Sequence, residues 1–217
     1  MHKYILLALC LTSLSSLASL NISTYNIRNY SPEFKMSDFN EKTSKPHLKK
    51  VLKSLGSDII AVQEIVDSND FGIFILNQLP KYGVALSSCG GTAKQKLGFL
   101  YNKKKIKLIK TSEDLSLSKT GKCDKGLRPA FIAEFKNLKT KKVFTVMALH
   151  LKAGNGPYSE STRVAQYSAI TSIIKSFTSS QRDNLVILGD FNTTGFLNKN
   201  GTYPEYMGFL KDVGGAY

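Results

Sequence analysis

The chain has 217 residues, 42% of them hydrophobic, and a formal net charge of +14 from 30 basic and 16 acidic residues. This length suits one domain with a real hydrophobic core, and the ordinary apolar content excludes a disordered chain and a membrane-embedded bundle. The basic excess favours a polyanionic partner, either nucleic acid or an anionic membrane surface, although it can also serve solubility alone. Charge does not distinguish DNA, RNA and phospholipid.

The N-terminus has the composition of a secretory signal peptide. A basic start is followed by an apolar stretch from Ile5 to Leu11 and then by small residues, with cleavage expected near Ala18 or Ser19. A short buried helix or a membrane anchor is the alternative, but the apolar stretch is too short to span a bilayer. We predict a signal peptide at residues 1–18, a domain at residues 19–217, and a secreted or periplasmic protein.

Cleavage there leaves two cysteines, Cys89 and Cys123. An even cysteine count in an exported protein suggests one disulfide, and two unrelated buried thiols are the alternative.

Hydrophobic periodicity predicts strands and helices in mixed order along the chain. The expected strands are Leu20–Tyr30, Asp58–Glu64, Tyr82–Ser88, Leu97–Asn102, Ala130–Phe135, Val143–Leu151 and Asn184–Asn192. The expected helices are Ser44–Leu55, Asn69–Leu79, Ser159–Phe177 and Tyr203–Val213. For the longest helix, we expect Ser159 as N-cap and an apolar stripe of Val164, Tyr167, Ile170, Ile174 and Phe177. This order favours two packed sheets with helices outside.

Four apolar runs end on residues suited to phosphate or metal chemistry. They are ISTYN at 22–26, IIAVQE at 59–64, VFTVMALH at 143–150 and LVILGDFN at 185–192. Buried strands of α/β sheets commonly deliver polar groups to one edge, where sites form. Asn26, Glu64, His150, Asp190 and Asn192 are therefore candidate site residues.

Glu64 is the strongest candidate metal ligand. A bare carboxylate at the end of a buried strand is costly unless it is paired, solvated or bound to a metal, and a hard oxygen ligand suits Mg²⁺ or Mn²⁺. Gln63 faces the opposite way in an extended strand, so we expect only one of the two residues at the metal, and the charge favours Glu64. A strand-end salt bridge with Arg128 or a lysine is the alternative. Asp190 and Asn192 point to the same side if their strand continues, although both are also common turn residues.

Basic groups near the other strand ends complete the candidate set. His150 has the chemistry of a general acid for a leaving alkoxide, although lone strand histidines are more often structural. Arg128 offers a rigid fork for phosphate, and Lys152 lies on the His150 side if that strand persists. Arg163 and Gln166, one helical turn apart, are expected to hold the adjacent loop rather than to touch substrate.

Together these segments resemble the endonuclease/exonuclease/phosphatase superfamily, which has the DNase I-like fold. The resemblance runs from Leu20 to the end of the chain and rests on STYNIR, DIIAVQEI, GFLYN, RPAFIAEF, ALHLKAG, RVAQ and VILGDFN in this order. Within the superfamily, the sequence looks most similar to secreted bacterial DNase I-like nucleases. The resemblance implies an α/β fold, a four-layer sandwich of two mixed sheets flanked by helices, and metal-dependent phosphodiester hydrolysis.

The resemblance also implies a role for each motif residue. Asn26 and Asn192 would contact the scissile phosphate, Glu64 would bind Mg²⁺ (or Mn²⁺ or Ca²⁺), and Asp190 would orient the attacking water or a metal. His150 would lie near the leaving oxygen. Arg128 would bind phosphate, and Lys152 is a further candidate for that contact. The expected partner is nucleic acid, DNA first, bound by a monomer that does not insert stably into membranes.

The chain departs from the family pattern at its end. Family members carry a closing Asp-His pair, and no such pair is found before Tyr217, so the last strands of the fold are also expected to be lacking. A fragment, an inactive enzyme, or a pair supplied by a partner chain would each account for this. A sphingomyelinase-like phospholipid phosphodiesterase and a catalytically dead nucleic-acid-binding module are the alternative functions.

Overall fold

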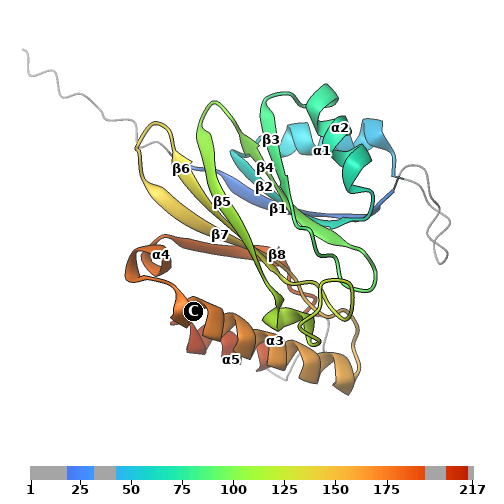
Figure 1. Cartoon of the computed structure of the whole chain (residues 1–217), viewed down its shortest axis with the longest axis vertical. Coiled ribbons are helices and arrows are strands. Elements are labelled where there is room, and N and C mark those ends of the chain that lie inside the picture. Colours follow the sequence, from blue (N-terminus) through green and yellow to red (C-terminus); the bar gives the residue numbers. More distant parts are fainter. Residues whose placement is uncertain (1–18, 32–42, 194–203, 215–217) are drawn as a thin grey trace, which may run out of the picture.

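The computed structural model describes residues 19–31, 43–193 and 204–214 (Figure 1). The predicted signal peptide lies outside these residues and stays a prediction. Within the described part of the chain, no helix is long and apolar enough to cross a membrane.

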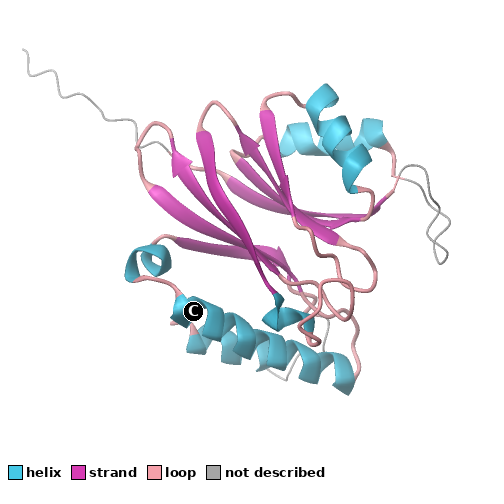
Figure 2. Cartoon of the chain, in the orientation of Figure 1, coloured by secondary structure: helices cyan, strands magenta, loops and turns pink. Residues whose placement is uncertain are grey.

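Two sheets form the centre of the molecule (Figure 2). In the described chain the first has the strand order β1-β2-β4-β3 and the second β5-β6-β7-β8. Their strands are β1 (Ile22–Tyr30), β2 (Ile59–Ile65), β3 (Tyr82–Leu86), β4 (Lys96–Asn102), β5 (Ile106–Asp114), β6 (Ala130–Asn137), β7 (Val143–His150) and β8 (Leu185–Asp190). The β1–β2 and β7–β8 pairs are parallel and the other pairs antiparallel, which confirms two mixed sheets.

The helices cover the outer face of each sheet, so the molecule has four layers (Figure 1). The helices are α1 (Lys45–Leu55), α2 (Ser68–Gln78), the one-turn η1 (Leu115–Ser118), α3 (Pro157–Ser176), α4 (Ser179–Asp183) and α5 (Pro204–Asp212). Helices α1 and α2 pack on the first sheet, and α3 and α5 pack on the second. The predicted four-layer α/β sandwich is confirmed.

Alternation along the strands divides the core into three apolar layers. On β2, Ile59 and Ala61 face the second sheet, whereas Ile60 and Val62 face the helices. On β7, Val146 and Ala148 face the first sheet in the same way. Because side chains of a strand alternate between faces, this parity decides which polar residues at the strand ends can meet between the sheets.

Several elements differ from the sequence-based prediction. Strand β5 was not predicted, because it is an edge strand on which only Ile106 is buried and its lysine-rich sequence shows no clear alternation. Helix α3 begins earlier than expected, with Gly156 as N-cap and Pro157 in its first turn, so Ser159 is not the cap. The predicted apolar stripe is wrong at Val164, which is exposed.

Cys89 and Cys123 form the predicted disulfide, with their Cα atoms 4.7 Å apart. The bond ties the segment after β3 to the loop after η1. Backbone hydrogen bonds support the same junction, since Gly91 N donates to Cys123 O and Thr92 N donates to Gly126 O.

Removing this disulfide should destabilise the domain strongly. We expect the Cys89→Ser/Cys123→Ser double variant to lose roughly 3–4 kcal/mol of unfolding free energy, because the bond closes a long loop in the unfolded chain. Denaturant unfolding of the oxidised protein and of the variant measures the difference. Equal unfolding free energies would show that the bond contributes nothing to stability.

Candidate active site

Four polar residues on the inner faces of the sheets lie at the same edge. Asn26 is the register partner of Gln63, and His150 is the register partner of Asp190. Each pair lies at the carboxyl end of a parallel strand pair. Each of its residues is an even number of positions from an apolar residue that packs between the sheets, so its side chain is on the same face. Strand ends of both sheets therefore deliver polar groups to one place, as expected for a site in an α/β protein.

Glu64 joins this cluster through an unusual backbone conformation. Its φ angle is +65°, in the left-handed region that non-glycine residues rarely adopt. By strict alternation it would follow Val62 towards the helices, but the β2–β4 register shifts between Val62 and Ile65. The irregularity turns the Glu64 carboxylate to the edge, while Gln63 stays between the sheets and exchanges hydrogen bonds with Thr24.

The Asn26 amide links the two acidic side chains of the cluster. Its Nδ2 donates to Glu64 Oε1 at 2.8 Å and to Asp190 Oδ2 at 2.9 Å. His150 Nε2 lies 3.6 Å from Glu64 Oε1 and 4.0 Å from Asp190 Oδ2. The structure thus brings together Asn26, Glu64, His150 and Asp190, which the sequence predicted as candidates.

Asn29 and Gln95 hold Glu64 in place, and sequence reasoning missed both. Asn29 N donates to Glu64 Oε2 at 2.9 Å, and Gln95 Nε2 donates to Asn29 Oδ1 at 2.6 Å. Asn29 has a φ of +56°, a conformation that asparagine tolerates better than most residues. No local pattern marks Gln95, because its contact depends on the loop after the disulfide-bonded Cys89.

The end of β1 is anchored from the helix side. The hydroxyl of the fully buried Tyr30 donates to Asp70 Oδ2 at 2.6 Å, and Lys45 Nζ contacts Asp70 Oδ1 at the same distance. Burial, together with the Asp70 carboxylate, raises the pKa of Tyr30 far above its ordinary value. The neutral phenol is therefore a permanent donor that ties β1 to α1 and α2.

Arg128 is buried close to the Glu64 and Asp190 carboxylates. Its Nη2 donates to Leu151 O at 2.8 Å, and its buried Nε has no hydrogen-bond partner among the described residues. Burial lowers the pKa of Arg128 to about 10, and the Glu64 and Asp190 carboxylates oppose that shift. The guanidinium stays charged at neutral pH and balances part of the acidic charge.

Asp190 and Asn192 meet through a turn rather than through strand alternation. Strand β8 ends at Asp190, and Asn192 has a φ of +49°, so the expectation that the strand continues to Asn192 is wrong. Asn192 N donates to Asp190 Oδ1 at 2.9 Å, and Asn192 Nδ2 donates to Leu151 O at 3.1 Å. The turn places Asn192 beside the cluster because its backbone binds the same carboxylate.

Lys152 lies at the edge of the cluster, in the loop that follows β7. Because β7 ends at His150, the condition that put Lys152 on the His150 side does not hold. Lys152 Nζ donates to Ala153 O, and Lys152 N donates to Gln166 Oε1. Arg163 Nη1 donates to Lys152 O and Gly154 O, so Arg163 and Gln166 hold this loop as expected.

His150 is neutral in the folded protein at neutral pH. Burial, followed by the nearby Arg128 charge, lowers the pKa of His150 from 6.5 to about 3, although Asp190 opposes the shift. Its buried Nδ1 has no hydrogen-bond partner among the described residues. A neutral imidazole donates from one nitrogen and accepts at the other, so His150 acts as a neutral hydrogen-bonding group until substrate changes its surroundings.

The low pKa predicts acid sensitivity that depends on His150. Between about pH 6.5 and pH 3, the unfolded chain protonates His150 and the folded chain does not, so unfolding free energy falls as pH falls. Between pH 7.5 and pH 5, we expect wild type to lose about 2 kcal/mol more than His150→Gln. Urea unfolding of both proteins at the two pH values measures this; identical losses would contradict a neutral His150.

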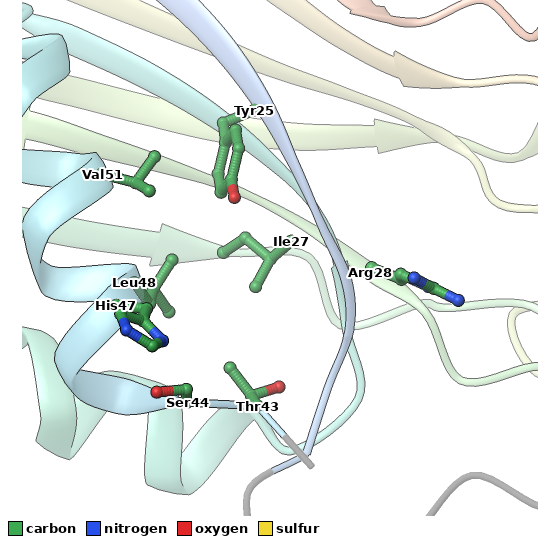
Figure 3. Close-up of a pocket in the computed structure, with 8 residues that line it drawn as sticks. All are labelled: Tyr25, Ile27, Arg28, Thr43, Ser44, His47, Leu48 and Val51. Atoms are coloured by element: carbon green, nitrogen blue, oxygen red, sulfur yellow. The ribbon is translucent and has the colours of Figure 1, made fainter. Parts of the chain in front are cut away.

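The other described histidine lies elsewhere. His47 lines a hollow of about 190 Å³ between β1 and α1, together with Tyr25, Ile27 and Leu48 (Figure 3). Tyr25 and Ile27 have the opposite parity to Asn26, so this hollow opens on the helix side of the first sheet. His47 therefore does not join His150.

The cluster fits a hydrated divalent cation. Glu64 and Asp190 each place a carboxylate oxygen within 3 Å of one amide nitrogen, which brings two hard anionic ligands close together. Among the described residues, no group of three or more His, Cys, Asp or Glu side chains forms a complete metal cage. Mg²⁺ usually keeps several waters and needs only one or two carboxylates plus substrate phosphate, so this donor set suits it.

Comparisons with known proteins agree with this geometry. The model of the Endonuclease/Exonuclease/phosphatase family matches residues 23–207. No curated protein sequence matches the chain.

Solved structures from several organisms share the fold. The human nocturnin catalytic domain is 17% identical with a TM-score of 0.65, over 89% of this chain and 70% of that one. A Bacteroides thetaiotaomicron mannosyl-6-phosphatase is 20% identical with a TM-score of 0.65, over 89% and 70%. D. rerio TDP2 complexed with single strand DNA product is 16% identical with a TM-score of 0.59, over 90% and 65%.

At these identities the structural likeness shows the fold alone, whereas the family model covers most of the chain. Members of that family are hydrolases that act as phosphodiesterases, nucleases or phosphatases, and they typically use divalent metal ions. This chain belongs to the endonuclease/exonuclease/phosphatase family.

Proposed function

We propose that the chain is a divalent-metal-dependent phosphodiesterase that hydrolyses nucleic acid, DNA first, outside the cytoplasm. The observation that carries the proposal is the convergence of Glu64 and Asp190 on the Asn26 amide, with His150 within 4.0 Å of both carboxylates. Phosphodiester hydrolysis needs charge neutralisation, an oriented water and a stabilised leaving group, and this cluster contains a group for each.

Each residue has a distinct part in the proposed chemistry. Glu64 would hold the cation, and a bound cation would supply charge neutralisation of the phosphate and a more acidic water. Asp190 accepts a hydrogen bond from the attacking water and so orients it. Arg128 balances phosphate charge, and His150 donates a neutral hydrogen bond to the leaving oxygen.

The asparagines need a small rearrangement to contact phosphate. Asn26 Nδ2 donates its protons to Glu64 and Asp190, so one of these hydrogen bonds has to open before the amide can donate to a phosphate oxygen. If Glu64 instead held a cation, the Asn26 N–H that now donates to Glu64 would be available to donate to a phosphate oxygen.

The surface charge supports a polyanionic substrate. The chain carries 30 basic and 16 acidic residues, and this overall excess favours a polyanionic partner. The lysine-rich β4–β5 and β6–β7 turns lie at the end of the sheets opposite the cluster, so the support comes from the net charge and not from these turns. The described exposed large apolar side chains belong to α2, β5, β7 and α3, rather than to one hairpin that could insert into lipid. These features favour nucleic acid over a phospholipid.

The disulfide supports a location outside the cytoplasm, because such bonds persist in oxidising compartments. Expression of the full chain with fractionation, followed by mass spectrometry of the exported protein, tests this part. A mature N-terminus near Ser19 supports export, and a full-length protein retained in the cytoplasm contradicts it.

A substrate panel tests the proposed activity. Double-stranded DNA, RNA, sphingomyelin vesicles and mannose 6-phosphate should be offered to the purified chain with Mg²⁺ and with EDTA. We expect metal-dependent cleavage of DNA and no release of phosphate from the sugar. Hydrolysis of the phospholipid or the monoester without cleavage of nucleic acid would contradict the proposal.

A further inference from the structure

Tyr158 is an exposed aromatic side chain at the start of α3. It is 63% exposed, and the other aromatic residues whose burial is described are buried or partly buried. An exposed ring costs hydrophobic free energy in the isolated protein, and such rings commonly serve as contact surfaces for ligands.

The backbone beneath this ring is firmly held. Tyr158 O accepts hydrogen bonds from Thr162 Oγ1 at 2.7 Å and from Ser161 Oγ at 3.1 Å. The preceding loop is held by the fully buried Arg163, which donates to Lys152 O and Gly154 O. The ring is therefore presented by a rigid segment, which lowers the entropy cost of binding a ligand there.

Lys119 lies against the hydroxyl end of the ring. Lys119 Nζ is 3.1 Å from the Tyr158 hydroxyl and 4.6 Å from the ring centroid. The hydrogen bond from Lys119 lowers the pKa of Tyr158, and the charges of Lys119 and, more weakly, Lys152 contribute. Two ammonium groups thus act on one exposed ring.

The end of η1 places Lys119 there. Lys119 caps η1 with a φ of +67°, the left-handed conformation in which many helices end. Leu127 N donates to Ser118 O, and the following loop is closed by the Cys89–Cys123 disulfide. In Figure 1 the short green helix η1 lies against α3.

Hydrogen bonds connect the junction of η1 and α3 to the catalytic cluster. Leu151 O accepts from Arg128 and Asn192 of the cluster, and Lys152 is the next residue. Gln166 accepts from Lys152 N and donates to Leu117 O of η1. Lys152 therefore borders the cluster, and the contact between Tyr158 and Lys119 lies farther out, where η1 and the start of α3 meet. We call these three residues the rim, and none of them is part of the cluster.

We infer that Tyr158, Lys119 and Lys152 form a rim subsite that binds a nucleotide flanking the scissile phosphodiester. An unpaired base, as in single-stranded nucleic acid, stacks on the Tyr158 ring, and the adjoining phosphate lies near the two ammonium groups. A hollow of about 160 Å³ beside Lys119 is lined by both apolar and polar residues, among them Ser116 and Ser161. Base–aromatic stacking beside basic groups is a common way to bind single strands. The inference rests on the proposed function and deepens it.

Tryptophan fluorescence tests the stacking directly, because the chain has no tryptophan. The Tyr158→Trp variant should show strong quenching when a single-stranded oligonucleotide is added in EDTA, which prevents cleavage. Val164→Trp is the matched control, because Val164 is 50% exposed on the same helix and is not part of the subsite. We expect little quenching of the control at the same occupancy.

Oligonucleotide affinity, measured by fluorescence anisotropy, provides the second readout. Tyr158→Ala should weaken binding about 5-fold to 100-fold, whereas Tyr158→Phe should keep most of the affinity because it keeps the ring. Lys119→Ala should make the fall of log association constant with log salt concentration less steep, by about 0.7. Lys139→Ala, on the distant β6–β7 turn, should change this slope less. All variants can be checked for unaltered unfolding, so a folding defect is recognised.

Two failures can be told apart. If wild type cleaves and binds the oligonucleotide but Tyr158→Ala binds equally well and Tyr158→Trp is not quenched, the rim subsite is wrong and the proposed function stands. If wild type neither binds nor cleaves nucleic acid, the proposed function is wrong and the subsite falls with it.

Discussion

Asp190→Asn should reduce DNA cleavage at least about 100-fold while the fold stays intact. Asp190 accepts hydrogen bonds from Asn26 Nδ2 and Asn192 N, and it is the group that we expect to orient the attacking water. Asparagine has the same shape but no charge, and its single acceptor oxygen can keep the bond from Asn192 N. The lost charge and the lost hydrogen bond from Asn26 are therefore the main changes. Initial rates on plasmid DNA at saturating Mg²⁺ measure the effect.

Asp183→Asn is the matched control for this variant. Asp183 ends α4 just before β8 begins, at the opposite end of that strand from Asp190, and it is exposed. We expect the Asp183→Asn variant to cleave DNA at the wild-type rate. If Asp190→Asn also cleaves at nearly the wild-type rate, the assignment of the cluster as the active site is wrong.

Glu64→Gln should raise the Mg²⁺ concentration needed for half-maximal cleavage by at least about 10-fold. Mg²⁺ prefers charged oxygen ligands, and Glu64 is the carboxylate that the irregular end of β2 turns towards the cluster. Glutamine keeps an acceptor for Asn29 N, so the local backbone should survive. Metal titration of activity and calorimetric titration of Mg²⁺ into the protein measure the change.

Glu160→Gln is the control, because Glu160 is an exposed carboxylate in the first turn of α3. Its metal dependence should equal that of wild type. An unchanged Mg²⁺ requirement in Glu64→Gln would remove Glu64 from the metal site and leave Asp190 as the remaining candidate.

The convergence of the strand ends could be read from the sequence because it depends on parity. Asn26, His150 and Asp190 end apolar runs, and each lies an even number of residues from a neighbour that faces the other sheet. Buried strands are apolar on one face or on both, so a polar residue that ends such a run stands out in the sequence. The architecture followed from the order of these elements.

Glu64 could not be placed with the same security. Alternation alone puts Glu64 on the helix side and Gln63 between the sheets, and the charge of Glu64 was the only reason to prefer it at the site. Its actual position depends on a left-handed residue and a register shift, both of which are set by tertiary contacts with Asn29 and β4. Backbone irregularities of this kind leave little trace in a single sequence.

Other differences have a readable cause. Pro157 follows Gly156, and proline in the first turn is a strong helix-start signal that outweighs Ser159 as a cap. The buried face of α3 includes Arg163 and Gln166, and Val164 points to solvent. Arg163 and Gln166 are buried because they donate to Gly154 O and Leu117 O. Apolar periodicity misses a helix face whose buried contacts are polar.

Plasmid nicking by the purified chain tests the central claim most directly. The chain should be treated with EDTA, assayed, and assayed again after Mg²⁺ is restored, with Asp190→Asn treated in parallel. The claim predicts no nicking in EDTA, nicking after Mg²⁺ is restored, and little or none by the variant. Nicking that persists in EDTA, or equal nicking by the variant, would contradict a metal-dependent site built from the strand ends, and no nicking under any condition would contradict the proposed nuclease activity of this chain.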